Sequence, residues 1–148
     1  TQAYFAPNDA FIEAMTQAAQ RGVDVRILMP GESDIGLLPL ASQHHYKTLL
    51  KAGIRVFEYD VSTMIHAKTA VVDGVWSTVG SSNLDYRSFI HNDEANAIIV
   101  SHDFARQLET VFETDLTHAR EIKLDQWRER GLWRQLKEWG ANMVKYWI

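Results

Sequence analysis

The stretch MIHAKTAVVDGVWSTVGSSNLD, residues 64–85, contains two apolar runs separated by Asp73-Gly74. An Asp-Gly pair between two runs of β-forming residues is a strong signal for a hairpin with a two-residue type I′ turn. We therefore expect strands at 65–72 and 75–80. Polar residues interrupt both runs at the ends that lie away from the turn. The question is why an otherwise apolar ribbon would carry them.

A two-residue turn predicts that Val72 lies opposite Val75, and this register sets the positions of the polar residues. Directly opposed residues share a face, and side chains along a strand alternate with period two. One end of one face should then hold His66, Lys68, Ser81 and Asn83. A cation, two neutral donors and an imidazole suit an oxygen-rich anion, most obviously a phosphate. The imidazole can act as a nucleophile towards phosphorus, so the cluster favours chemistry on a phosphodiester.

The rest of the chain predicts the fold class. Apolar periodicity indicates helices at 10–21, 42–51 and 103–112, and strands at 2–6, 23–29, 54–59 and 95–100. Helices that alternate with strands are typical of an α/β domain. We expect a mixed β-sheet flanked by helices on both faces.

Composition narrows the function classes. The chain has 148 residues, of which 46% are apolar and 23% charged, as expected for a globular domain. It has no cysteine, and its acids are not spaced as metal ligands, so we expect no metal and no cofactor. No apolar run reaches the length of a membrane-spanning helix. The net charge of −4 gives no sign of nucleic-acid binding.

The last 31 residues differ from the others. Residues 118–148 carry seven Lys or Arg against four Asp or Glu, a charge of +3, which leaves −7 for residues 1–117. They also hold Trp127, Trp133, Trp139 and Trp147. We predict a domain at 1–117 and an amphipathic helical tail at 118–148. This tail either packs on the domain or lies in a membrane interface, with basic groups towards anionic lipid.

The motif residues resemble the signature of the phospholipase D superfamily, H-x-K-x4-D followed after six residues by G-[ST]-x-N. Here it is formed by His66, Lys68, Asp73 and the run Gly80-Ser81-Ser82-Asn83. Glu94 stands where the family has an acidic residue that supports the histidine. The run NLDYRSFIHNDEANAIIV, residues 83–100, further resembles bacterial cardiolipin synthases, except that His91 replaces an expected apolar residue. Upstream and tail segments are also similar to these synthases, so the likeness covers nearly the whole chain.

The resemblance implies a phosphatidyltransferase that makes cardiolipin from phosphatidylglycerol through a phosphohistidine. It implies that His66, Lys68, Asp73 and Glu94 are catalytic, and that Lys68, Ser81 and Asn83 bind phosphate. Family enzymes build one site from two motifs, whereas this chain carries one. We therefore expect the C-terminal half of such a synthase, without the helix that normally precedes its first strand. The partners would be a second half, in the same parent chain or a homodimer, and the cytoplasmic face of the bacterial inner membrane, bound peripherally.

Several alternatives stay open. Asp73 before glycine is already explained by turn chemistry, and Glu94 could be a solvated carboxylate rather than the group that orients His66. His44-His45 has no ligand partner at metal spacing, although His44 could line the substrate cleft. The chain could also be a homodimeric nuclease or other phosphodiesterase, a hydrolase that releases phosphatidic acid, or an inactive membrane-binding half.

Overall fold

The computed structural model describes residues 1–33, 38–60, 64–128 and 131–143. Within these ranges the strands are β1 (Phe5–Ala6), β2 (Arg26–Pro30), β3 (Arg55–Tyr59), β4 (Thr69–Val72), β5 (Trp76–Gly80), β6 (Leu84–Asp85), β7 (Asn96–Val100) and β8 (Ala119–Ile122). The helices are α1 (Asp9–Gln20), α2 (Leu38–Lys51), α3 (Tyr86–Ile90), α4 (His102–Leu116), α5 (Leu124–Arg128) and α6 (Leu132–Met143). The predicted α/β class with flanking helices is confirmed, although the described residues form three separate sheets rather than one mixed sheet.

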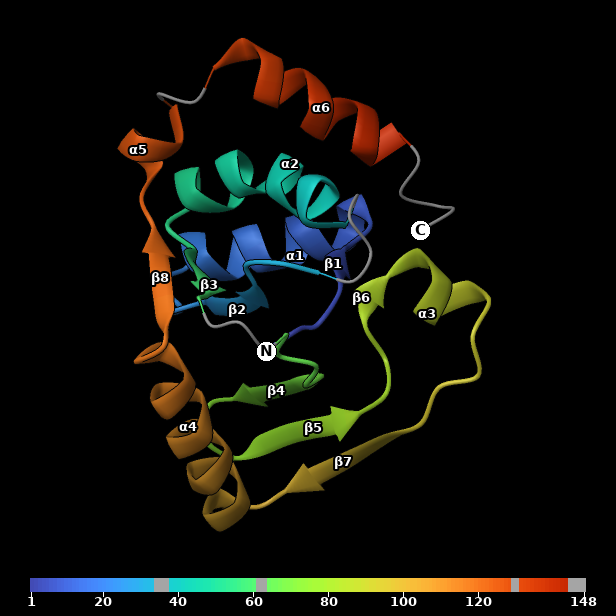
Figure 1. Ribbon diagram of the computed structural model, residues 1–148. Helices are drawn as coiled ribbons and strands as arrows, with labels where there is room; N and C mark the ends of the chain where they lie inside the picture. The colour runs from blue at the N-terminus through green and yellow to red at the C-terminus, as the bar shows by residue number, and fades with distance from the viewer. Residues whose placement is uncertain (34–37, 61–63, 129–130, 144–148) are drawn as a thin grey trace.

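The first layer of the fold is the sheet β2-β3-β8, with β2 and β3 parallel and β8 antiparallel to β3. Leu28 and Val56 on its strands are fully buried. Helix α2 packs between this sheet and α6, and α1 lies beside α2 (Figure 1). Tyr46 and Leu49 of α2 join Val56 in one apolar cluster. Most of the hydrophobic stabilisation therefore comes from this half of the molecule.

Local sequence signals start and stop α1. Asn8 is its N-cap, and its side chain accepts a hydrogen bond from the backbone N–H of Phe11 at 3.0 Å. Gly22, with φ of +91°, follows its end in the left-handed region that glycine tolerates. Residues next to the helix thus set both ends of α1, which lies close to the predicted range of 10–21.

The second sheet, β4-β5-β7, is antiparallel throughout and lies below the first in Figure 1. The N-terminal residues join the two sheets. The N–H of Gln2 donates to Leu28 O of β2 at 3.0 Å, and the N–H of Thr69 in β4 donates to Thr1 O at 3.0 Å. The same segment continues into β1, which pairs in parallel with β6. The first six residues therefore run along the seam between the two sheets.

The predicted hairpin register is wrong by one residue. The turn itself is as expected, since Asp73 (φ 53°) and Gly74 (φ 63°) are both left-handed and Val75 N–H donates to Val72 O at 3.2 Å. Val72, however, lies opposite Trp76 rather than Val75. The carbonyl of Val75 instead accepts from the N–H of Ser101 at 2.9 Å. A long-range bond to the residue after β7 thus takes Val75 out of the ladder and shifts the register.

The first strand of the hairpin is also shorter than predicted. It begins at Thr69, and Lys68 pairs with Gln2 in an isolated antiparallel bridge. Residues 64–67 belong to no strand. The opposition of His66 and Ser81 that we expected is therefore not formed by a regular ladder.

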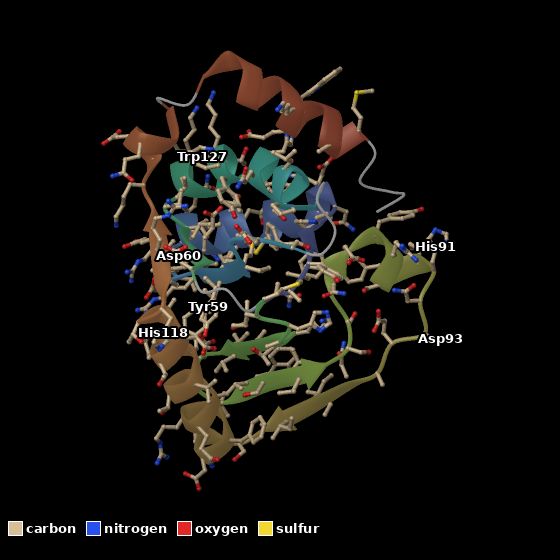
Figure 2. The ribbon with its side chains drawn as sticks, viewed as in Figure 1. Tyr59, Asp60, His91, Asp93, His118 and Trp127 are labelled. Carbon is tan, nitrogen blue, oxygen red and sulfur yellow. The ribbon has the colours of Figure 1, made fainter. Side chains whose placement is uncertain are left out.

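The tail at 118–148 does not begin as a helix. Its first residues form β8, which extends the first sheet, and Asp60 N–H donates to His118 O at 2.9 Å. Figure 2 shows Tyr59, Asp60 and His118 together at this junction. Trp127 of α5 is buried against Tyr46, with ring centroids 4.9 Å apart. The start of the tail thus packs on the domain, and its assignment as a separate unit stays a prediction.

Helix α6 buries Glu138 and Ala141 and exposes Trp139. The side chain of Trp133 and the whole of Trp147 lie outside the described residues. Among the helices that the structure describes, none combines the length and the apolar character needed to cross a membrane.

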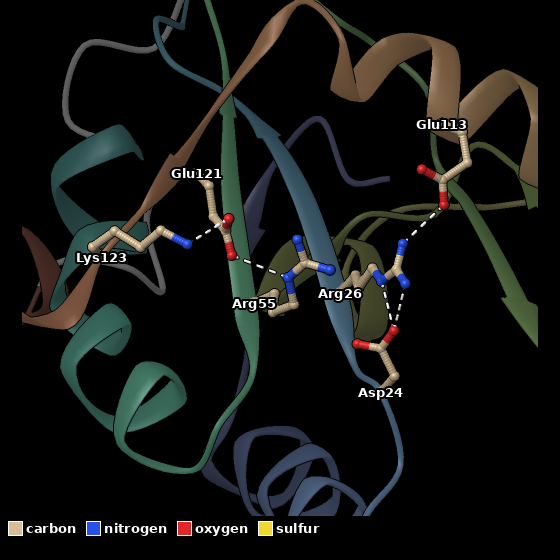
Figure 3. A network of polar contacts seen from close by, with 6 residues as sticks. All are labelled: Asp24, Arg26, Arg55, Glu113, Glu121 and Lys123. Carbon is tan, nitrogen blue, oxygen red and sulfur yellow. Dashed lines mark hydrogen bonds and ion pairs between the residues drawn. The ribbon is translucent and has the colours of Figure 1, made fainter.

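Ion pairs at the sheet surface link elements that are distant in sequence. Arg26 of β2 contacts Asp24 at 2.6 Å and Glu113 of α4 at 2.8 Å, and Arg55 of β3 contacts Glu121 of β8 at 3.0 Å (Figure 3). These side chains are partly exposed, so each pair is worth at most about 1 kcal/mol. The pairs tie α4 to β2 and link β3 with β8 inside the first sheet.

Candidate active site

His66 and Lys68 contact each other at the N-terminal end of β4. The ammonium Nζ of Lys68 lies 2.9 Å from His66 Nδ1 and 3.3 Å from Nε2, and it donates to His66 O at 3.0 Å. Lys68 is buried, whereas His66 is exposed. The lysine reaches the imidazole from inside the protein and leaves one side of the ring open to solvent. A phosphate that arrives there meets an imidazole and a buried cation together.

The run Gly80-Ser81-Ser82 lies against the start of β7. A Cβ on Gly80 would come within 1.8 Å of Asn96 Oδ1 and 2.4 Å of Ala95 O, so this position requires glycine. The N–H of Ser82 donates to Asn96 Oδ1 at 3.3 Å, and the Oγ of Ser81 accepts from Ala95 N–H at 3.0 Å. The glycine of the motif therefore allows close approach of two strands, which holds the serines in place.

Asn83 and Glu94 are joined through a residue that the sequence did not single out. The N–H of Asn83 donates to the Oγ of Ser88 at 3.1 Å, and this Oγ donates to Glu94 Oε1 at 2.8 Å. The Oδ1 of Asn83 is buried and has no hydrogen-bond partner within the described part of the chain. A buried unsatisfied amide oxygen destabilises a protein unless a ligand or a water supplies a donor, so Asn83 has capacity for a ligand.

The electrostatics connect Glu94 to the rest of the cluster. Hydrogen bonds from Ser81, Ser88 and Asn92 hold the pKa of the Glu94 carboxyl below its usual value, and the positive charge of Lys68 adds to this effect. The hydrogen bonds of Glu94 go to these groups and not to His66. The structure thus places Ser81, Asn83 and Glu94 in one cluster around Ser88, and His66 and Lys68 in contact with each other. Glu94 lies beside the serine loop, and Lys68 acts on it through its charge. The catalytic and phosphate-binding roles of these residues remain predictions.

Asp73, the sixth residue, lies apart from the others. It occupies the turn at the opposite end of β4, five residues after Lys68, or roughly 16 Å along an extended strand. It is exposed, and its left-handed backbone fits an aspartate in a type I′ turn. Its position accords with the turn explanation.

The other histidines discussed above make ring contacts of their own. His91 caps α3 at the outer edge of the molecule, where its ring contacts Tyr86 (Figure 2). His44 and His45 contact each other on α2, with ring centroids 5.3 Å apart. In the described ranges no three His, Asp or Glu side chains group as metal ligands would.

Sequence reasoning missed four residues that support the candidate site. Ser88 bridges Asn83 and Glu94, Asn96 holds Ser82, Gln2 Oε1 accepts from Leu84 N–H at 3.1 Å, and the ring of Tyr4 contacts His66. Ser88 alone has a local signal, because Asp85 caps α3 by accepting from Ser88 N–H at 2.7 Å. The others act across distances in sequence that no local pattern encodes.

Comparison with known proteins identifies the family. Residues 1–116 match the family model described as cardiolipin synthase, PLD-like domain. The chain is 37% identical over 135 residues to cardiolipin synthase 2 of Bacillus anthracis and 38% identical over 135 residues to a cardiolipin synthase of Staphylococcus aureus. These alignments cover 91% of this chain but only 26% and 27% of the relatives. The chain thus spans about a quarter of the length of the curated relatives it matches.

Two solved structures share the fold. The phospholipase D family member Nuc from Salmonella typhimurium superimposes with a TM-score of 0.69 at 24% identity, covering 82% of this chain and 78% of that one. Phosphatidylserine synthase from Haemophilus influenzae has a TM-score of 0.75 at 16% identity, covering 99% of this chain and 40% of that one. The motif, the fold and the family match agree, and the chain belongs to the cardiolipin synthase family of phospholipase D-like domains.

Proposed function

We propose that this chain supplies one motif of a phosphatidyltransferase site of the cardiolipin synthase type. The observation that carries the proposal is the contact between an exposed imidazole and a buried ammonium, His66 and Lys68. The unsatisfied buried oxygen of Asn83 supports it. Family membership supports the same conclusion. The substrate is a phosphodiester of an anionic lipid, phosphatidylglycerol.

The reaction needs two imidazoles on one phosphate. A nitrogen of the first attacks phosphorus, the P–O bond to glycerol breaks, and the second imidazole gives its proton to the leaving oxygen. The second imidazole then takes the proton of a hydroxyl from another phosphatidylglycerol. That oxygen attacks phosphorus, the P–N bond breaks, and cardiolipin and the free first imidazole are formed. His66 is one of the two, and the other comes from a second half in the parent chain or in a homodimer.

The remaining residues would bind the phosphate. Lys68 turns from His66 towards a phosphate oxygen, which is a stronger hydrogen-bond acceptor for an ammonium than a neutral imidazole. Asn83 and Ser81 provide neutral polar groups. Glu94 holds the serine loop through Ser81 and Ser88. In this proposal Asp73 shapes the hairpin turn and takes no part in the chemical steps.

Peripheral attachment to an anionic membrane surface, at the cytoplasmic face of the bacterial inner membrane, suits such a substrate. The exposed Trp139 on α6 is a side chain that favours the interface between water and lipid. The basic excess of residues 118–148 would add electrostatic attraction to phosphatidylglycerol.

The test is incubation of the purified chain with labelled phosphatidylglycerol in mixed micelles, followed by mass spectrometry of the lipids. A parallel tube contains plasmid DNA. We expect cardiolipin from the wild-type chain and none from His66→Ala, with His91→Ala as the matched histidine control.

Other products separate the alternatives. Phosphatidic acid without cardiolipin indicates a hydrolase, because water then replaces the lipid hydroxyl. A nicked plasmid without lipid product indicates a nuclease and contradicts the proposal. Micelle binding that survives His66→Ala, with no product from either protein, indicates a membrane-binding half without its own activity.

A further inference from the structure

The ring of Tyr4 contacts both His66 and Lys68 of the candidate site. Its centroid lies 5.6 Å from that of the His66 imidazole, with the two planes at 88°, and 5.6 Å from the Nζ of Lys68. The first contact has the edge-to-face geometry that aromatic pairs prefer. The second falls within the roughly 6 Å at which an ammonium is attracted to a ring face. One side chain thus touches the imidazole and the ammonium together.

His66 depends on such side-chain contacts for its orientation. It lies before β4, on residues that belong to no strand, and it is exposed. In the part of the chain that the structure describes, its ring contacts are those with Tyr4 and Lys68. Removal of the Tyr4 ring would therefore leave Lys68 as the imidazole's neighbour, and Lys68 itself must move when phosphate binds.

The residues on either side of Tyr4 fix its backbone relative to the core and to the site. Gln2, two residues earlier, bridges to Lys68 and accepts a hydrogen bond from the N–H of Leu84, the residue after Asn83. Phe5, one residue later, is buried in the main core. Tyr4 is thus fixed between the apolar core and both parts of the site.

We propose that Tyr4 is a positioning residue whose ring holds the His66 imidazole and the Lys68 ammonium in the arrangement that receives phosphate. The expected effect of Tyr4 on catalysis rests on the proposed function, whereas its effect on the orientation of His66 does not. The ring, and not the phenolic hydroxyl, carries the effect, because both contacts are made by the π-system. Phenylalanine should therefore replace tyrosine, whereas an aliphatic side chain should not.

The test compares Tyr4→Phe with Tyr4→Leu, and uses Tyr4→Met as a second variant without a ring should the leucine variant fail to fold. The matched control is Tyr59→Leu, which removes another tyrosine that packs against a histidine, His118, with centroids 6.4 Å apart (Figure 2). Two readouts are used. One is the nitrogen-15 NMR signal of the His66 imidazole during a titration with inorganic phosphate, assigned with His66→Ala. The other is the kcat and KM for labelled phosphatidylglycerol.

We expect Tyr4→Leu or Tyr4→Met to shift the His66 signal and weaken its response to phosphate. We also expect them to lower kcat by roughly 10- to 100-fold, as a displacement of about 1 Å does, with little change in KM. Tyr4→Phe and Tyr59→Leu should match the wild type in both readouts.

Two results would overturn the inference: an unchanged His66 signal and kcat without the ring, or a Tyr4→Phe variant as defective as Tyr4→Leu. If neither the wild-type protein nor any variant makes cardiolipin, two copies of this chain do not complete a site, which contradicts the homodimer form of the proposed function. The NMR signal of His66 then still decides whether Tyr4 orients the imidazole.

Discussion

The two sheets of this molecule differ in how much of their surface is buried. In β2-β3-β8 the central residues of β2 and β3 are buried. Leu28 and Val56 have no exposed surface, and Val56 packs in the apolar cluster with Tyr46 and Leu49 of α2. In β4-β5-β7, Ile98 is 65% exposed and Val100 72% exposed on the edge strand. The candidate site lies where these two sheets meet, on the residues around the seam formed by Gln2 and Tyr4.

This difference separates stability from chemistry. The first sheet supplies the core, whose apolar burial stabilises the fold. The second sheet presents exposed side chains along β7, and the candidate site lies at the end of β4, where Lys68 precedes the strand. This contrast predicts that substitutions in the core of the first sheet lower stability. Substitutions at the seam between the sheets should instead lower activity.

His66→Ala should have the largest effect on activity with the smallest effect on stability. The side chain is exposed, so we expect little change in the free energy of unfolding. Loss of a nucleophile or general acid should lower lipid transfer by about 10² to 10⁴-fold. Urea unfolding and the lipid assay on the same preparation measure both. A large loss of stability in His66→Ala would contradict the view that the first sheet supplies stability and the seam supplies activity.

The two sheets themselves are compared by Leu28→Ala and Ile98→Ala. We expect Leu28→Ala to lower the free energy of unfolding by about 2 to 5 kcal/mol, because it leaves a cavity in a fully buried position. Ile98→Ala should lower it by less than about 1 kcal/mol, because the side chain is mostly exposed. Equal losses in urea unfolding would mean that the β7 face is covered in solution.

Gly80→Ala tests the join between the second sheet and the site. The added Cβ would collide with Asn96 and the backbone of Ala95, so we expect a loss of about 1 to 3 kcal/mol in unfolding free energy. The matched control is Gly140→Ala on α6, where a Cβ meets nothing within 4 Å. A helical site favours alanine over glycine by up to about 1 kcal/mol, so the control should be neutral or stabilising. If the two variants unfold at the same temperature, the fold does not require the close approach of Asn96 and Ala95 to Gly80.

A weaker effect concerns pH. Hydrogen bonds from Arg55 and Lys123 hold the pKa of Glu121 below its ordinary value of 4.5. Because the folded pKa is depressed, this stabilisation is present above pH 4.5 and is lost as the pH falls below it through the folded pKa. Glu121→Gln should therefore lower stability by less than about 1 kcal/mol at pH 7 and have no such effect well below pH 4. Urea unfolding at several pH values measures this, and 1 M salt should reduce the difference.

Much of the fold could be predicted because its signals are local. Asn8 and Gly22 mark the ends of α1, and Asp73-Gly74 marks the hairpin turn, since caps and turns depend on the conformations that a few neighbouring residues allow. The kinds of chemical group at the candidate site could also be predicted, because imidazole, ammonium, hydroxyl and amide groups keep their properties wherever they are placed. Their catalytic and phosphate-binding roles stay predictions.

Features that depend on distant backbone contacts could not be read in this way. The bond between Ser101 and Val75 shifts the hairpin register by one residue, and pairing with β3 turns residues 119–122 into a strand. Tyr4 reaches His66 across 62 residues, and Asn96 closes on Gly80 across 16. Such contacts form only when the sheets assemble, because their energy comes from pairing and packing between segments and not from the conformational preference of either one.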